Sequence, residues 1–291
     1  MPELPEVETI RSDLKAVILN KKIEKIEIKD NKVIGKDHKK DYLSLEGLKI
    51  IEIDRQGKLL AFVLSNNNYL LIHLKMTGQL VLKDNKNIIA GGHPFSEKDV
   101  KGAIGNTLPN KHTRFVIYFS NNKSLFFNDI RRFGYVSLVN KEKWKEIKSR
   151  YGPEPLKEEF KLSKFKEILS NRKAPIKATL LNQKLISGLG NIYVDEALFL
   201  AQIDPRRETK SLSEEEAKKL FKAIIKIIKD AIKHRGTTFS DYLDAKGNVG
   251  NFSSRLKVFG KKGDKCPRCN DEIKKIKVAG RGTHICENCQ K

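Results

Sequence analysis

The spacing of hydrophobic residues changes twice along the chain. Residues 5–18 carry Val7, Ile10, Leu14 and Ile18 on one face, which predicts an amphipathic helix. From residue 23 to about 139, short apolar runs alternate with turn signals, and this pattern predicts strands. We expect them at 26–28, 48–53, 58–64, 69–74, 114–119, 124–128 and 134–139. Many short strands in series favour an antiparallel β-sandwich, in which residues 83–110, poor in apolar repeats, form a long inserted loop.

Helical spacing appears after the Gly- and Pro-rich residues 152–155. Ser163 is expected to cap a helix through 169, and Pro175 to begin a second helix that ends near 183. Asn191 is expected to cap a third helix that stops before Pro205. The capping box Ser213-x-x-Glu216 opens a long fourth helix, which Gly236 closes.

All four cysteines lie in the last 26 residues, as the two pairs Cys266-x2-Cys269 and Cys286-x2-Cys289. This spacing fits one structural Zn²⁺ held by four thiolates. Disulfides in a secreted protein are the alternative, and the chain offers no secretory signal to support it. Residues 273–278 and 283–285 are expected to form a hairpin between the pairs, with Arg281 at its tip facing either solvent or a phosphate.

The segments together predict a multidomain α+β protein. Residues 1–150 form an antiparallel β-sandwich with an N-terminal helix and the inserted loop at 83–110. Residues 151–260 form a helical domain, and residues 261–291 form a small four-cysteine finger with a β-hairpin.

The net charge of the chain restricts the classes of partner that it can bind. Its 58 basic and 36 acidic residues give a formal charge of +22, which implies DNA, RNA or an anionic membrane surface. Hydrophobic residues make up 39% of the chain, enough for packed cores, so a disordered chain is excluded. No apolar run approaches the ~18 residues that span a bilayer, and the acidic N-terminus lacks the apolar region of a signal peptide. We therefore expect a cytoplasmic protein without a membrane partner.

The N-terminus offers unusual chemistry. Removal of the initiator methionine would leave Pro2 with a free secondary amine, whose pKa of about 8 leaves more of it neutral than a lysine. Such an amine attacks an aldehyde to give an iminium, an electron sink for elimination. Glu3 and Glu6 could then serve as general acid and base, or they could simply complement the dipole of the following helix.

Two further segments suit nucleic acid. The glycine turn before Asn191 brings backbone N–H groups to a helix start, where Asn191 could bind a phosphate, cap the helix, or do both. The second segment, 128–134, carries Arg131, Arg132 and Phe133, a mixture that suits a groove contact with a wedge between bases. A buried phenylalanine beside surface arginines is an equally ordinary interpretation.

The opening Met1-Pro2-Glu3-Leu4-Pro5-Glu6, the segment 188–199 and the ending 280–290 together resemble the bacterial formamidopyrimidine-DNA glycosylase family. Leu4 favours the oxidised-purine branch over the endonuclease VIII branch, which usually has glycine there. The resemblance implies a β-sandwich, a helix–two-turn–helix domain and a zinc finger that grip double-stranded DNA. It implies a monomeric enzyme of base excision repair at the bacterial nucleoid, a glycosylase and abasic-site lyase that removes 8-oxoguanine and formamidopyrimidines and cuts by β,δ-elimination.

The resemblance also implies roles for single residues. Pro2 is the Schiff-base nucleophile, Glu3 the acid that assists sugar opening and base loss, and Glu6 its supporting carboxylate. Lys58, which would otherwise read as a surface lysine at a strand end, matches the lysine of the β-elimination step. Arg281 matches the finger arginine of the δ-elimination step, where it would clamp the departing phosphate.

The remaining positions implied by the resemblance concern DNA. Phosphate contacts fall on Arg172, Lys177 and Asn191, and contacts of the β domain on His73 and His112. Met76, Arg131 and Phe133 match the residues that fill the hole left by the flipped nucleotide, where an arginine can satisfy the unpaired cytosine. Residues 235–242 match a loop that folds over the extruded base.

The chain departs from the family pattern at two places. The connection at 83–110 is longer than usual, and Asn182 stands where the family usually has aspartate. Two other classes of function remain as alternatives: a non-catalytic DNA-damage-binding protein on the same scaffold, and an RNA-binding zinc-ribbon protein. Neither has a physical reason to keep Pro2, Glu3 and Lys58 together.

Overall fold

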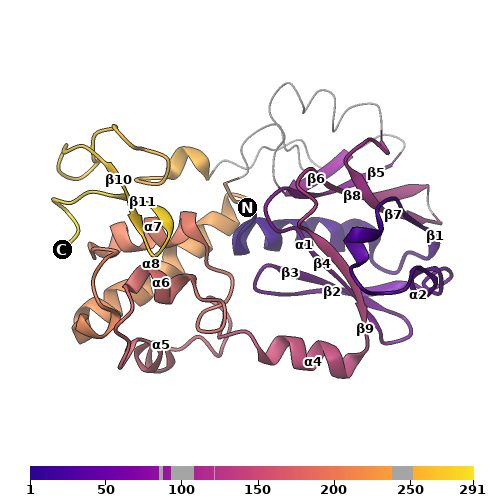
Figure 1. The fold of residues 1–291 in the computed structure, drawn as a ribbon, viewed down its shortest axis with the longest axis horizontal. Coiled ribbons are helices and arrows are strands. Elements are labelled where there is room, and N and C mark those ends of the chain that lie inside the picture. Colours follow the sequence, from indigo (N-terminus) through magenta and orange to yellow (C-terminus); the bar gives the residue numbers. More distant parts are fainter. Residues whose placement is uncertain (85–87, 93–107, 121, 238–251) are drawn as a thin grey trace. The chain divides into compact units, whose positions relative to one another are not determined.

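The computed structural model describes residues 1–84, 88–92, 108–120, 122–237 and 252–291 (Figure 1). The chain forms two compact units. The first comprises Met1–Ser149 and His234–Ser253, and the second comprises Arg150–Lys233 and Ser254–Lys291. None of the described helices is long and apolar enough to cross a bilayer.

Two antiparallel sheets make up most of the first unit, in the strand orders β1-β7-β8-β5-β6 and β2-β3-β4-β9. The strands are β1 (Ile23–Ile28), β2 (Ile50–Gln56), β3 (Leu59–Leu64), β4 (Tyr69–His73), β5 (Gly78–Lys83), β6 (Ile88–Gly92), β7 (Thr113–Phe119), β8 (Lys123–Asp129) and β9 (Tyr135–Val139). The helices are α1 (Leu4–Ile18), the 3-10 helix η1 (Asn31–Ile34), α2 (Lys39–Leu43) and α4 (Lys141–Ser149).

One hydrophobic core joins α1 to both sheets. Val7, Ile10, Leu14 and Ile18 pack with the inner faces of the strands, and none of the four is more than 3% exposed. On the outer face of the four-stranded sheet, Trp144 of α4 packs against a second small cluster. The predicted helix and the antiparallel sandwich are therefore confirmed.

The structure corrects the predicted loop at 83–110. Residues 78–83 and 88–92 form strands β5 and β6, which pair with each other, so the irregular connection is shorter than expected. Strand β5 escaped prediction because its first five residues are all buried, which leaves no alternation of apolar and polar positions. The rest of the predicted loop, residues 93–107, lies outside the described residues. Helix α4 was also missed, because Trp144 and Ile147 are its only large apolar residues.

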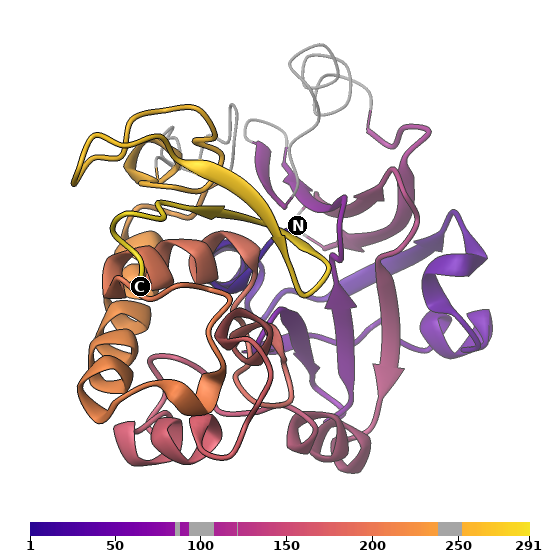
Figure 2. The same cartoon turned by 60° about the vertical axis from the view of Figure 1, so that its left-hand side comes forward.

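Helices dominate the second unit: α5 (Leu162–Leu169), α6 (Ile176–Leu181), α7 (Asn191–Ala201), the 3-10 helix η2 (Thr209–Ser211) and α8 (Glu214–Lys233). A further 3-10 helix, η3 (Ser253–Arg255), precedes the hairpin of β10 (Lys274–Val278) and β11 (Arg281–Ile285), drawn in yellow in Figure 2. The predicted capping box is confirmed, since Ser213 N donates to Glu216 Oε2 at 2.8 Å and Glu216 N to Ser213 Oγ at 3.2 Å.

Other predicted helix starts are wrong by one or two residues. Helix α5 is capped by Lys161 rather than Ser163, and α7 by Gly190, which makes Asn191 the first helical residue. Pro175 caps α6 instead of beginning it. These shifts matter for Asn191, because its side chain is released from capping and is free to bond elsewhere.

The hairpin turn also differs from the prediction. Ala279 and Gly280 both have positive φ, 48° and 75°, and Val278 pairs directly with Arg281. This is the two-residue geometry that matches the twist of antiparallel strands. The tip is therefore Ala279-Gly280, and Arg281 is the first residue of β11 rather than part of the tip.

Candidate functional site

The start of the chain is packed into the first unit. Met1 is 43% exposed, but Pro2 is buried and Glu3 is only 3% exposed. Glu3 is the residue before helix α1, and its backbone N–H donates to Glu6 Oε2 at 2.8 Å. The two carboxylates therefore do serve the helix start, which was one of the two interpretations, and this contact also fixes the residue that follows Pro2.

The second oxygen of Glu6 bonds to a distant segment of the same unit. Glu6 Oε1 accepts from Thr237 N at 2.8 Å and from Thr237 Oγ1 at 3.0 Å. Gly236 has a φ of +81°, and a Cβ there would lie 2.6 Å from Glu6 Oε1. Only glycine fits this approach. The sequence predicted a loop over the extruded base at 235–242, of which 238–242 lie outside the described residues, but it gave no sign that this region bonds to Glu6.

Lys58 lies in the two-residue turn between β2 and β3 and is 7% exposed. The turn is tied to α1 by Arg55, which donates through Nη1 to Gly57 O at 2.8 Å and through Nε to Glu8 Oε2 at 2.9 Å. Burial alone would raise the pKa of Glu8, but the hydrogen bonds from Arg11 and Arg55 lower it below its usual value. The surface interpretation of Lys58 is wrong, and Glu8 and Arg55 were not predicted.

These groups share one electrostatic environment. Burial lowers the pKa of the Met1 amino group below its ordinary value of 8.0, while Glu3 and Glu6 raise it and Lys58 lowers it further. The structure thus brings Pro2, Glu3, Glu6 and Lys58 together around the chain end. An amine at this position is desolvated, a condition that increases its neutral and nucleophilic fraction.

His73 and His112 occupy other positions in the first unit. Burial, together with the positive charges of Lys75 and Lys58, lowers the pKa of His73 to about 3. Its Nδ1 accepts from Lys75 N at 3.0 Å, so the neutral ring carries its hydrogen on Nε2 as a donor. His112 is half-buried, and its backbone N–H bonds to Asn110 Oδ1 at 2.9 Å.

Large apolar side chains project from two loops of the same unit. Met76 is 39% exposed and Phe133 is 53% exposed. The guanidinium of Arg131 lies over the Phe133 ring, 4.7 Å from its centroid. Phe133 is therefore not a buried residue, and the alternative of an ordinary core phenylalanine is wrong. Ile130 is exposed to the same degree as Met76 and was not predicted.

In the second unit, the surroundings of Lys177 contradict the prediction that this residue contacts a phosphate. The side chain is fully buried, and Nζ donates to Asp195 Oδ1 at 2.5 Å, Thr283 Oγ1 at 2.8 Å and Gly282 O at 3.2 Å. An ammonium has three hydrogens, and all three are used here. Lys177 therefore holds the hairpin to helices α6 and α7 instead of reaching DNA.

Asn191 bonds to the same hairpin. Its Nδ2 donates to Gly282 O at 2.9 Å, while Oδ1 has no hydrogen-bond partner among the described residues. Arg281, the neighbour of Gly282, is exposed. Arg172 is half-buried and donates through Nε to Ile168 O at 2.6 Å, which orients its guanidinium. Asn191 and Arg281 therefore flank one carbonyl and belong to one local arrangement.

The four cysteines are reduced and close together. Their Sγ atoms all lie within 4.8 Å of one another, with separations of 3.8 Å for Cys266–Cys289 and 3.4 Å for Cys269–Cys286. Four thiolates about 2.3 Å from a tetrahedral zinc stand roughly 3.8 Å apart, so the cluster fits this ion. Disulfides, with sulfurs about 2 Å apart, do not fit.

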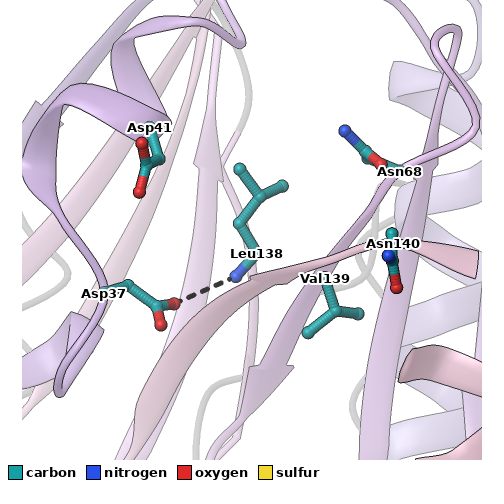
Figure 3. Close-up of a pocket in the computed structure, with 6 residues that line it drawn as sticks. All are labelled: Asp37, Asp41, Asn68, Leu138, Val139 and Asn140. Atoms are coloured by element: carbon teal, nitrogen blue, oxygen red, sulfur yellow. Dashed lines mark hydrogen bonds between the residues drawn. The ribbon is translucent and has the colours of Figure 1, made fainter. Parts of the chain in front are cut away.

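A surface pocket of about 290 Å³ lies elsewhere in the first unit, lined by Asp37, Asp41, Asn68, Leu138, Val139 and Asn140 (Figure 3). Asp37 Oδ2 accepts from Tyr42 OH at 2.7 Å, and from Ser137 Oγ and Leu138 N at 3.3 Å. The carboxylate is thus occupied in joining α2 to β9, and we assign this pocket no chemistry.

Three family models match the chain in order. They are described as the formamidopyrimidine-DNA glycosylase N-terminal domain, over residues 1–136, the formamidopyrimidine-DNA glycosylase H2TH domain, over 151–242, and the zinc finger found in FPG and IleRS, over 263–291. The last match and the thiolate geometry together confirm one structural zinc ion.

Individual proteins agree with these matches. The chain is 41% identical over 293 residues to a formamidopyrimidine-DNA glycosylase of Desulfitobacterium hafniense, and both chains are covered completely. It is 37% identical to the Lactococcus lactis enzyme in complex with Fapy-dG DNA, with a TM-score of 0.84 and coverage of 99% and 100%. A complex of the same enzyme with abasic-site DNA gives a TM-score of 0.85 at 37% identity, with 99% of each chain covered.

Proposed function

This chain belongs to the formamidopyrimidine-DNA glycosylase family, and we propose that it excises oxidised purines from double-stranded DNA and then nicks the strand by β,δ-elimination. The observation that carries the mechanism is the buried chain end, where Glu3, Glu6 and Lys58 all act on the amino group of Met1, the residue next to Pro2. We propose a cytoplasmic site of action at the nucleoid, because that is where bacterial DNA lies.

Pro2 supplies the nucleophile once Met1 is removed. Its nitrogen lone pair forms a bond to the sugar C1′, the bond from C1′ to the damaged base breaks, and the base leaves with the proton that the Pro2 nitrogen gives up. The sugar ring then opens as its ring oxygen takes a proton from Glu3, giving an iminium on Pro2. The interaction of Glu3 with the amino group at the chain end supports a role for its carboxyl in this step.

The iminium drives the two eliminations. It acidifies the C2′ hydrogen, a base removes that proton, and the 3′ phosphate leaves; a second elimination then expels the 5′ phosphate. We assign Lys58 to the first elimination, which its burial beside the chain end supports. Arg281 is assigned to the second, since an exposed guanidinium can hold the phosphate as negative charge develops. Glu6 fixes Glu3 through its backbone N–H.

The proposed DNA contacts divide by unit. In the first unit, Met76, Arg131 and Phe133 fill the gap left by the flipped nucleotide. His73 and His112 donate hydrogen bonds to the sugar-phosphate backbone of the DNA. In the second unit, Arg172 and Asn191 bind phosphates, since Asn191 Nδ2 has two hydrogens and Gly282 O takes one of them. Zinc holds the finger that carries Arg281.

Borohydride trapping on an 8-oxoguanine duplex tests the proposal. We expect a covalent adduct on Pro2 of the mature chain, a weaker lyase in Pro2→Gly, and a severe loss of base release in Glu3→Gln. Glu142→Gln is the matched control, because Glu142 lies in the first turn of α4. Cleavage without a trappable adduct, or an adduct on another residue, would overturn the mechanism, and binding without cleavage would favour the non-catalytic alternative.

A further inference from the structure

Two loops cross between the sheets at one end of the sandwich. Residues 74–77 lead from β4 to β5, and residues 130–134 lead from β8 to β9. His73 pairs with Tyr135 in one sheet, and Gly78 pairs with Asp129 in the other. Because the loops start and end on paired residues, they must run beside each other. One loop carries Met76, and the other carries Arg131 and Phe133.

A buried hydroxyl and a buried carboxylate tie these loops together. Thr77 Oγ1 donates to Asp129 Oδ1 and accepts from Arg131 N at 3.0 Å. Asp129 Oδ2 accepts from Gly134 N at 2.7 Å. Asp129 is 1% exposed and Thr77 is 9% exposed, so water competes little for these bonds. We call Thr77 and Asp129 the loop clamp.

The backbone around the loop clamp is tightly packed. A Cβ on Gly134 would lie 2.6 Å from Phe127 Cζ and 3.1 Å from Asp129 Oδ2. Arg132 has a φ of +59° and pairs with Asp30 at 2.6 Å. Its neighbours Arg131 and Phe133 remain exposed and stack on each other. The loop is thereby held in one conformation from both ends.

We propose that Thr77 and Asp129 are positioning residues that hold Met76, Arg131 and Phe133 as one rigid group and so determine discrimination between cytosine and adenine opposite the lesion. This inference rests on the proposed function, in which the three side chains enter the DNA. A guanidinium is a planar fork of donors, and it distinguishes cytosine from adenine only at a fixed angle. Without the loop clamp, Arg131 keeps its charge and its attraction to DNA, but its guanidinium is no longer held at that angle.

The experiment compares excision rates from 8-oxoguanine duplexes with cytosine or adenine opposite the lesion, with enzyme in excess. Thr77→Val keeps the shape of the side chain and removes the hydroxyl. We expect the cytosine-to-adenine ratio to fall about tenfold, the size of effect that loss of a hydrogen bond to a charged group produces. Binding to undamaged DNA should stay unchanged, and Thr77→Ser should restore the ratio.

Two controls separate positioning from general damage to the fold. Thr209→Val removes another buried hydroxyl that makes two hydrogen bonds, to Thr179 Oγ1 and Ala174 O, and should leave the ratio unchanged. In an Arg131→Ala background the reading group is gone, so Thr77→Val should change the ratio no further. An unchanged ratio in the single variant, or an equal fall in the Arg131→Ala background, overturns the proposal.

A second variant and a second readout keep the test decisive. If Thr77→Val shows no cooperative thermal transition, Asp129→Asn is measured instead, because an amide has only one acceptor oxygen and cannot accept from both Thr77 Oγ1 and Gly134 N; an unchanged ratio there also refutes the loop clamp. If the wild-type protein forms no Schiff base, the proposed function fails. The clamp is then tested with 2-aminopurine beside a tetrahydrofuran site, whose fluorescence should rise less with Thr77→Val than with wild type; an equal rise refutes it.

Discussion

Replacing Lys177 by methionine should destabilise the second unit without weakening any contact with phosphate. The ammonium bonds to Asp195, Thr283 and Gly282, and both side chains of the ion pair are completely buried. Methionine has a similar length, so packing changes little while the charge is lost. Asp195 is then left as a buried carboxylate without its cation.

The expected loss follows from that arrangement. Breaking a buried ion pair by removing one partner costs about 3–5 kcal/mol. Asp195 retains the bond from His284 N at 2.9 Å, so we expect the lower end, about 3 kcal/mol, or roughly a hundredfold in the ratio of folded to unfolded protein. Adding Asp195→Asn to Lys177→Met removes the uncompensated charge and should recover more than half of the loss.

The assay uses the position of the single tryptophan. Trp144 lies in the first unit, so its fluorescence in urea follows that unit alone, while release of zinc to a chromophoric chelator follows the second. We expect Lys177→Met to shift zinc release to lower urea and to leave the Trp144 transition in place. In parallel, DNA affinity is measured at several salt concentrations.

The salt dependence distinguishes the two roles of Lys177. A lysine that neutralises a phosphate contributes about 0.9 to the slope of log affinity against log salt. A buried positioning lysine contributes nothing to that slope. A slope reduced by about one in Lys177→Met, together with unchanged zinc release, would refute the reasoning and restore the direct phosphate contact.

Three further predictions concern the chain end, His73 and the finger. Gly236→Ala forces a Cβ against Glu6 at a positive φ, so borohydride trapping should slow at least tenfold, and a rate equal to wild type would contradict the packing. The pKa of His73 is about 3 in the folded protein and about 6.5 in the unfolded chain. The contribution of His73 to the free energy of unfolding is therefore fully present above pH 6.5 and is lost as the pH falls toward 3, by at most about 1.4 kcal/mol per pH unit. Trp144-monitored unfolding should lose that slope in His73→Gln; identical slopes would exclude the shift. Removal of zinc should abolish specific DNA binding in a gel-shift assay, because the finger that carries Arg281 loses its fold. Retained affinity would show that the role of Arg281 does not depend on the zinc site.

Local patterns were enough to predict part of this molecule. The apolar face of α1, the capping box before α8 and the cysteine pairs each depend on residues within a few positions of one another. Chemistry that depends on short spacing is therefore visible in the sequence. The same applies to the buried chain end, because Pro2, Glu3 and Glu6 are neighbours in the chain.

The remaining features depend on distant partners. Lys177 looks like a solvated lysine until Asp195 and Thr283, 18 and 106 residues away, surround it. Glu6 gains Thr237 from 231 residues along the chain. Strand β5 is buried on both faces and shows no alternation, so only its pairing with β6 and β8 identifies it.

The first unit is assembled from two separate stretches of chain, and this has a consequence for the order of events during synthesis. Residues 1–149 leave the ribosome first, followed by the helices of the second unit, and Thr237 emerges only after them. Until then Glu6 lacks its distant partner. The bond between Met1 and Pro2 is therefore most accessible to a peptidase on the nascent chain, before folding buries Pro2, and the timing of that cut determines whether a molecule carries the amine that we propose as the nucleophile.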